Sequence, residues 1–355
     1  MIAVIADDIT GAAEMAGIAH RLGLRVKLTM RPEATPDCDV LVIATDTRSM
    51  SESEAAAVSR EIASTVMTLP EVDAIFKKTD SALRGHVVAE LEALLSVTDY
   101  DRALFIPANP SRGRIIRDGV YYIGETPLHE TDFSFDPEFP AFSSVLSERL
   151  PDCESKGVRY ADAVCAEDIT TAVKNAGHHT LLAGAADLFT EFLRQRFTCS
   201  EIPAEKCVLD LSDCLIIRGS TQSKAIDCGV ETAYMPTEVY NETIGPESWI
   251  QQLADSYSKS HALIIAVRNR HRTGKAIATY LRNTMADATA ALASVHTPAE
   301  LIIEGGATAF AILHRLDWNS FTITQEISPG VIRMRATNGT HITMKPGSYP
   351  WGQLF

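Results

Sequence analysis

Short, continuous apolar runs alternate with longer amphipathic segments along the N-terminal half of the chain. Each short run predicts a buried strand, and each segment with apolar residues at three- and four-residue spacing predicts a helix. Buried strands joined by helices indicate βαβ units around a mostly parallel sheet. Ser51 followed by Glu54 also predicts a capping box at the start of one helix. The predicted strands are 2–6, 26–30, 39–44, 73–78, 102–106 and 180–183, and the predicted helices are 10–22, 51–67, 86–96 and 185–196.

Residues 107–145 interrupt this alternation with five prolines, six aromatic residues and no helical period. A loop of this length in a compact domain is usually functional or disordered. Its aromatic residues favour an ordered, packed loop.

The alternation resumes after residues 198–212, where we place a domain boundary that divides the chain into 1–205 and 206–355. Asn338-Gly339 predicts the tight turn of a final hairpin. The predicted fold class is therefore α/β, with two lobes, each a mostly parallel sheet flanked by helices, and a C-terminal β-hairpin. The predicted strands are 214–218, 232–235, 262–267, 300–304, 320–326, 331–335 and 341–345, and the predicted helices are 220–228, 247–259, 274–294 and 307–317.

Composition narrows the class of protein. The chain has 355 residues, 46% of them apolar and 22% charged, which is typical of a globular protein of about two domains. A net charge of −14 argues against nucleic acid or anionic membranes as partners. No signal peptide or spanning segment is visible, and seven cysteines without a Cys-x-x-Cys pair favour a cytoplasmic protein with free thiols. No residues have the spacing of a metal site. The sequence leaves the oligomeric state open, with a homodimer as one alternative.

Polar residues follow the first and third predicted strands. Asp7 and Asp8 come directly after strand 2–6, and ligands of open α/β sheets bind beyond the carboxyl ends of the strands. The structural alternative is an acidic helix start that complements the helix dipole. Arg48 follows strand 39–44 and is suited to hold a carboxylate, although it could instead cap a helix or pair with Asp46.

The segment 77–85, Lys-Lys-Thr-Asp-Ser-Ala-Leu-Arg-Gly, is the densest polar cluster. Within it, Asp80 is the candidate base that accepts a hydroxyl proton, with Asp8 as its rival, while the cations neutralise anionic substrate groups. A solvated surface turn is the alternative. Because all three clusters follow strands of one sheet, we expect them to converge on one crevice. Arg114, in the long loop, suggests an anion grip or a lid hinge, or ordinary loop charge.

Three glycine-containing turns follow predicted strands in the second lobe, and small residues at a helix start let backbone N–H groups approach a phosphate. Their combination favours a nucleotide phosphate site, although neither the P-loop nor the dinucleotide fingerprint is present. The turns are Arg218-Gly219-Ser220, Glu304-Gly305-Gly306-Ala307-Thr308 and Lys345-Pro346-Gly347-Ser348.

Together these motifs resemble the four-carbon acid sugar kinases, formerly a domain of unknown function, which include 3-oxo-tetronate, threonate and erythronate kinases. The resemblance covers nearly the whole chain in order. Its most specific part is Lys78–Gly85, followed by the start motif Ala6–Ala12. The other matching segments are Thr45–Arg48, Pro107-Ala108, Gly113-Arg114, Asp118-Gly119, Gly219-Ser220, Gly305–Thr308, Glu326, Pro329-Gly330 and Lys345–Ser348.

The resemblance implies an N-terminal sugar-acid lobe and a C-terminal ATP lobe, with ATP and Mg²⁺ as cofactors. The sugar-acid hydroxyl would meet the γ-phosphate presented by the glycine turns. The residues expected at the sugar acid are Asp7, Asp8, Arg48, Lys78, Asp80, Ser81, Arg84 and Arg114, and those expected at ATP are Ser220, Gly305, Gly306, Ala307, Thr308 and Gly347.

Two departures from the family pattern stand out. Ala307 replaces the Asp or Glu usual after the paired glycines, and the chain is shorter than most relatives. The leading hypothesis is an ATP-dependent kinase that phosphorylates a hydroxyl of a small sugar acid such as a tetronate or 3-oxo-tetronate. Ala307 motivates the alternative of a non-catalytic or degenerate member that senses a sugar acid or nucleotide. A dehydrogenase or ligase is a third possibility, and the missing dinucleotide fingerprint argues against the dehydrogenase.

Overall fold

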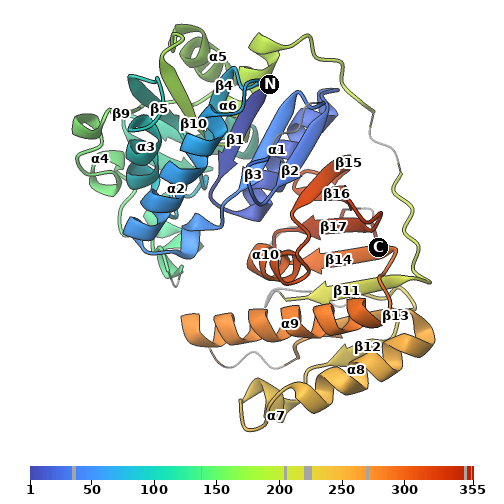
Figure 1. The fold of residues 1–355 in the computed structure, drawn as a ribbon. Coiled ribbons are helices and arrows are strands. Elements are labelled where there is room, and N and C mark those ends of the chain that lie inside the picture. The colour runs from blue at the N-terminus through green and yellow to red at the C-terminus, as the bar shows by residue number, and fades with distance from the viewer. Residues whose placement is uncertain are drawn as a thin grey trace. The chain divides into compact units, whose positions relative to one another are not determined.

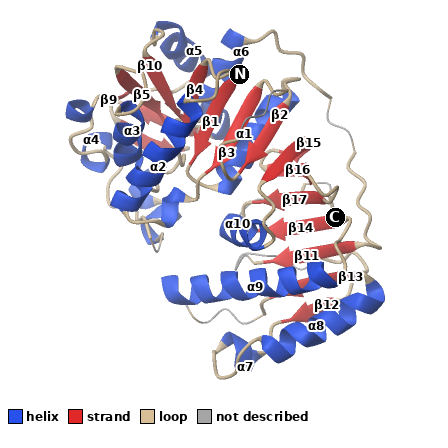
Figure 2. Cartoon of the chain, viewed as in Figure 1, coloured by secondary structure: helices blue, strands red, loops and turns tan. Residues whose placement is uncertain are grey.

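The computed structural model describes residues 1–33, 37–136, 138–203, 206–219, 226–268, 272, 274–347, 350–352 and 354–355. These residues form two compact units, unit 1 from Met1 to Ile202 and unit 2 from Pro203 to Phe355 (Figures 1 and 2). Each unit is an α/β structure whose strands pair mostly in parallel, which confirms the predicted fold class. The division falls within the segment 198–212 chosen from the sequence.

The sheet of unit 1 is parallel throughout, because its strands are buried on both faces and are joined by helices. The register pairs Ala6 with Ala44 on one side and with Lys78 on the other, so three neighbouring strands end level with one another. Its strand order is β2 (Val26–Thr29), β3 (Val40–Ala44), β1 (Ile2–Ala6), β4 (Ala74–Lys78), β10 (Thr180–Gly184), β5 (Arg102–Ile106) and β9 (Val158–Tyr160).

Some helices of unit 1 begin at a side chain that caps them. Asp8 is the N-cap of α1 and accepts a hydrogen bond from Gly11 N at 2.9 Å. The predicted capping box of Ser51 and Glu54 is confirmed at the start of α2. Two helices, α4 and α5, were not predicted. The helices are α1 (Ile9–Arg21), α2 (Glu52–Met67), α3 (Val87–Leu95), α4 (Leu146–Arg149), α5 (Ala166–Asn175) and α6 (Ala186–Arg196).

The stretch 107–145 is ordered and packed, as its aromatic residues predicted, and Tyr121 is fully buried. It also contains a small antiparallel sheet of β6 (Arg114–Arg117), β7 (Val120–Ile123) and β8 (Thr126–Pro127), which was not predicted. A 3₁₀ helix, Asp132–Phe135, follows.

The sheet of unit 2 is parallel except for its antiparallel strands β15, β16 and β17. Gly339, with φ of 97°, lies in the predicted turn before β17. Residues 220–225 of the predicted helix 220–228 lie outside the described residues. The strand order is β12 (Thr232–Tyr234), β13 (Ala262–Ala266), β11 (Cys214–Arg218), β14 (Glu300–Glu304), β17 (His341–Lys345), β16 (Val331–Ala336) and β15 (Ser320–Ser328), and the helices are α7 (Thr237–Tyr240), α8 (Glu247–Ser260), α9 (Lys275–Val295) and α10 (Gly306–Arg315).

Among the described helices, none is both long enough and apolar enough to cross a bilayer.

Candidate active site

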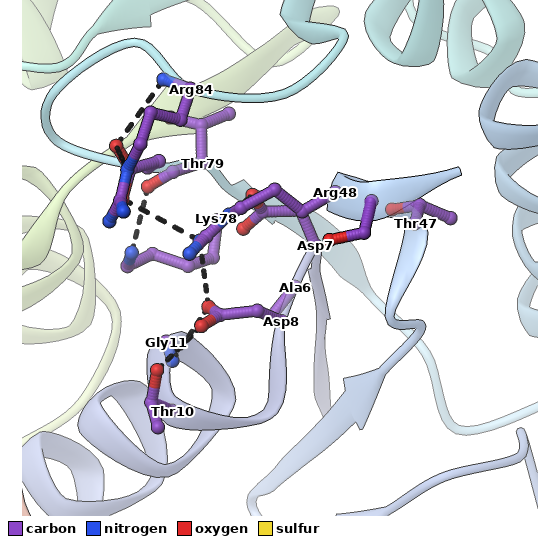
Figure 3. A network of polar contacts seen from close by, with 12 residues as sticks. Ala6, Asp7, Asp8, Thr10, Gly11, Thr47, Arg48, Lys78, Thr79 and Arg84 are labelled. Carbon is purple, nitrogen blue, oxygen red and sulfur yellow. Dashed lines mark hydrogen bonds and ion pairs between the residues drawn. The ribbon is translucent and has the colours of Figure 1, made fainter. Parts of the chain in front are cut away.

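Three carboxylates of unit 1 surround one guanidinium. Arg48 Nε lies 2.7 Å from Asp7 Oδ2, and Arg48 Nη2 lies 2.8 Å from Asp8 Oδ1 (Figure 3). Arg48 Nη2 also lies 3.6 Å from Asp80 Oδ1. These residues follow β1, β3 and β4, whose carboxyl ends are level. The sheet therefore brings together three polar clusters that are far apart in the sequence.

Asp8 is both a helix cap and a member of this cluster. Its Oδ2 accepts a hydrogen bond from Thr10 Oγ1 at 2.5 Å, in addition to the contacts of Oδ1 with Gly11 N and Arg48. Burial raises the pKa of Asp8, but the charges of Arg48 and Lys78 outweigh it and hold the pKa below its ordinary value. Asp8 is therefore ionised at neutral pH.

Gly11 is required by this close packing. A Cβ at Gly11 would lie 2.6 Å from Asp8 Oδ1 and 3.1 Å from Lys78 Nζ. Lys78 is buried, donates to Thr79 O at 2.7 Å and lies 3.8 Å from Glu14. The side chain of any other residue at position 11 would displace the capping carboxylate or the lysine.

Asp80 has almost no free acceptor capacity. Its Oδ2 accepts from Ala82 N at 2.9 Å and from Arg84 Nε at 3.0 Å, and its Oδ1 accepts from Arg84 Nη2 at 2.8 Å. Burial raises the pKa of Asp80, but Arg48, Arg84 and Lys78 together hold it far below the usual range. The carboxylate therefore fixes Arg84 in a bidentate ion pair.

Ser81 joins the turn after β4 to the long loop. Arg114 Nη1 donates to Ser81 Oγ, and the Tyr121 hydroxyl donates to Ser81 O. Arg84 Nη1 lies 3.4 Å from Asp136 in the same loop. All eight residues expected at the sugar acid thus belong to one connected region of unit 1.

Glu14 was missed by the sequence analysis. Its carboxylate lies 3.1 Å from Arg112 Nη1 as well as near Lys78. The available signal was a lone acidic residue in the otherwise small and apolar first three turns of α1. Tyr121 and Asp136 carried no such signal, because their partners lie 40 and 52 residues away in the chain.

In unit 2, one buried carboxylate connects three strand ends. Glu304 Oε1 lies 2.6 Å from Lys345 Nζ, and Glu304 Oε2 lies 3.7 Å from Arg218 Nε. Lys345 Nζ also donates to the carbonyl oxygens of Pro346 at 3.2 Å and Gly347 at 3.3 Å. The parallel register of β11, β14 and β17 places these residues side by side.

The glycine turns of unit 2 pack against each other through their backbones. Gly219 N donates to Glu304 O at 3.2 Å, and Gly305 N donates to Lys345 O at 3.0 Å. A Cβ on Gly219 would lie 2.8 Å from the Cβ of Thr308, so this contact requires glycine. Gly306 begins α10, Ala307 is exposed in its first turn and Gly347 follows β17, whereas Ser220 lies outside the described residues.

The N-terminus of α10 is the feature of unit 2 best suited to a phosphate. Its first N–H groups have no partner within the helix, and the helix dipole favours an anion there. Lys345 and Arg218 add positive charge at the same sheet edge. In the described parts of both units, no group of three or more His, Cys, Asp or Glu side chains is arranged to hold a metal ion.

The sequence matches two family models. Residues 2–187, more than half of the chain, match a model described as a sugar-binding N-terminal domain, and residues 233–349 match one described as a nucleotide-binding C-terminal domain.

Curated relatives are kinases of four-carbon sugar acids. A D-threonate kinase of Salmonella typhimurium is 32% identical over 41% of this chain and 35% of its own length, and a D-erythronate kinase of Heliobacterium modesticaldum is 29% identical over 49% and 41%. The matched region thus covers less than half of the length of each of these two relatives. A 3-oxo-tetronate kinase of Haemophilus influenzae is 24% identical over 98% of this chain and 97% of its own length.

Solved structures share the fold. A Haemophilus influenzae protein has a TM-score of 0.73 at 20% identity and covers 99% of this chain and 97% of its own. A Salmonella typhimurium protein has a TM-score of 0.76 at 19% identity over 98% and 96%. With the two family models in their expected order, these findings show that the chain belongs to the four-carbon acid sugar kinase family.

Proposed function

We propose that this protein is an ATP-dependent kinase that phosphorylates a hydroxyl of a four-carbon sugar acid. The observation that carries the proposal is the buried cluster of Asp7, Asp8 and Asp80 around Arg48, at the sheet edge where α/β proteins bind ligands. The sugar-binding family model spans this cluster, and the nucleotide-binding model spans the turns after β14 and β17. Unit 1 would hold the acceptor and unit 2 the donor.

Asp8 is the better candidate to orient the reacting hydroxyl. Asp8 Oδ2 accepts one described hydrogen bond, from Thr10, and so keeps acceptor capacity. Asp80 Oδ2 accepts from both Ala82 N and Arg84, and Asp80 Oδ1 is shared between Arg84 and Arg48. A carboxylate that is ionised at neutral pH can accept the hydroxyl proton, and phosphoryl transfer depends mainly on positioning and charge. Asp80 would act by holding Arg84.

In unit 2, the N-terminus of α10 and Lys345 would meet the phosphates of ATP. Magnesium in such sites is held by one or two carboxylates together with phosphates and water. Glu304, the carboxylate at the end of β14, already pairs with Lys345 and lies 3.7 Å from Arg218, so in the described arrangement it is not suited to hold a nucleotide-borne Mg²⁺. Ala307 offers no carboxylate at the next turn.

The test is ADP release with D-threonate, D-erythronate and 3-oxo-tetronate as acceptors. We expect turnover with at least one acid, and we expect Asp8→Asn to lower kcat about a hundredfold or more without changing the KM for ATP. Asp39→Asn, which removes one partner of an exposed ion pair, is the control and should keep its rate. Folded protein that turns over none of these acids would refute the proposal. A near-normal rate in Asp8→Asn would move the role to Asp80.

The second candidate function is a sugar-acid or nucleotide sensor without transfer. Ala307 favours it, because it places no acidic side chain at the exposed first turn of α10. Calorimetry that detects binding of both ligands, in a protein that transfers no phosphate, would support the sensor. Activity restored by Ala307→Asp would identify a degenerate kinase. A homodimer stays a prediction; among related structures, one from Bordetella bronchiseptica is described as a domain-swapped dimer with bound citrate.

A further inference from the structure

Phe133 lies against two of the cations of unit 1. The guanidinium carbon of Arg84 is 5.7 Å from the centre of its ring, and that of Arg114 is 5.6 Å away. Both distances are within the range of cation–π attraction. The ring belongs to the 3₁₀ helix Asp132–Phe135, where the side chain of Thr131 accepts a hydrogen bond from Phe133 N.

The two cations differ in their countercharges. Arg84 forms a bidentate pair with Asp80 and lies near Asp136. Arg114 donates to the neutral hydroxyl of Ser81, and within the described residues no carboxylate comes within ion-pair distance of it. Arg114 is therefore a half-buried cation that lacks a countercharge of its own.

Arg48, one of the sequence's candidates to hold a carboxylate, is in the opposite situation. Three carboxylates already surround it, and they raise its pKa well above the ordinary value although burial alone would lower it. The donors of Arg48 that point at these carboxylates are therefore already used by the chain itself, and a further anion would have to displace one of them. The anionic group of a substrate is better accommodated at Arg114.

We propose that Arg114 binds the carboxylate of the sugar acid and that Phe133 is the specificity-determining residue that orients its guanidinium. The inference rests on the proposed site of unit 1 and names how that site distinguishes an acid from a neutral polyol. A carboxylate supplies the countercharge that Arg114 lacks, through two parallel N–H···O hydrogen bonds. A neutral four-carbon polyol offers no such charge.

The chain provides a matched control for Phe133. Phe135 lies in the same 3₁₀ helix, but its side chain is 84% exposed. We expect Phe133→Leu to weaken binding of the sugar acid about fivefold to thirtyfold, because two cation–π contacts are lost. Phe135→Leu should bind as the unmodified chain does. Phe133→Tyr keeps the ring and should restore affinity, which separates the proposal from a general packing defect.

The experiment is calorimetry on the full chain with D-threonate, D-erythronate and the neutral polyol erythritol, with ATP affinity measured in parallel. Arg114→Gln should weaken binding of the acid about tenfold to a hundredfold, reduce its preference over erythritol and leave ATP affinity unchanged. An unaltered preference in Arg114→Gln, or equal effects of Phe133→Leu and Phe135→Leu, would overturn the proposal.

Failure of this inference can be told apart from failure of the kinase proposal. A chain that binds the acids in the expected Phe133- and Arg114-dependent way, but releases no ADP, refutes only the kinase. A chain that phosphorylates an acid equally well with and without Arg114 refutes only the carboxylate assignment. An unmodified chain that binds neither acid refutes both.

Discussion

Asp8 and Asp80 owe their ionised state to their cationic neighbours rather than to water. Burial opposes ionisation of each carboxyl, and Arg48, Lys78 and, for Asp80, Arg84 reverse the effect, so that both pKa values lie below the ordinary 3.8. A carboxyl whose pKa is depressed by folding stabilises the protein above its unfolded pKa. That stabilisation is lost as the pH falls toward the folded pKa.

We therefore expect the free energy of unfolding to fall steeply below about pH 4, because the carboxylates bind protons there in the unfolded chain but stay ionised in the folded cluster. Urea unfolding at pH 7, 5, 4 and 3 measures this dependence. Asp80→Asn should be less stable at pH 7, because it leaves buried cations unpaired, and should show a shallower loss of stability below pH 4. Parallel pH curves for the two proteins would contradict the assignment of a depressed pKa to Asp80.

At the level of secondary structure, β14 carries a buried glutamate at each end. Glu304, at the carboxyl end, pairs with Lys345 beside the proposed nucleotide turns. Glu300, at the amino end, pairs with Arg333. The same strand therefore offers two buried ion pairs, of which only one is near the proposed ligand.

We expect Lys345→Met and Arg333→Met each to lower the free energy of unfolding by about 3–5 kcal/mol, because each removes the nearest cation from a buried carboxylate. Only Lys345→Met should also weaken ATP binding, about tenfold, since Lys345 holds the turn at Pro346 and Gly347. Chemical denaturation and calorimetry on both variants make the comparison. Equal ATP affinity in the two variants would remove Lys345 from the nucleotide site.

The sequence predicted those elements whose physical signal is local. Most of the parallel strands were predicted because continuous apolar runs fill strands buried on both faces. The exception in unit 1 is β9, which has only three residues. The helix α5 was missed because only Ile169 and Val173 of its ten residues are buried, which leaves a narrow apolar stripe. The strands β6 to β8 were missed because they span two to four residues and include Pro127.

The same distinction holds for the site. Convergence of Asp8, Arg48 and Asp80 could be predicted, because parallel strands deliver their ends to one edge. The placement of two arginines beside the Phe133 ring, and the occupation of both Asp80 oxygens by hydrogen-bond donors, depend on loop contacts. Many of these contacts join residues that are far apart in the chain. No local pattern encodes such contacts.

On the scale of the whole chain, the two compact units each have a proposed ligand. A ligand stabilises the structure that binds it by mass action, by about 2.7 kcal/mol at a hundred times its Kd. When two domains unfold in separate transitions, the transition that shifts to higher temperature identifies the domain that binds the ligand.

Differential scanning calorimetry of the full chain should show two transitions. We expect the sugar acid to raise the midpoint of one and ATP to raise that of the other. Asp8→Asn should diminish the first shift, and Lys345→Met the second. If both ligands instead raise the midpoint of one common transition, the two units unfold together. That result would contradict the prediction that each ligand stabilises a different unit.

The ammonium group of Lys345 also lies 4.9 Å from the centre of the Trp351 ring. Indole emission responds to a charge at this range, and the chain has three tryptophans in all. A phosphate that draws Lys345 away from the ring would alter the electric field at the chromophore. The protein thus contains an intrinsic fluorescent probe beside its proposed nucleotide turns, and nucleotide titrations could be followed by light emission without any attached dye.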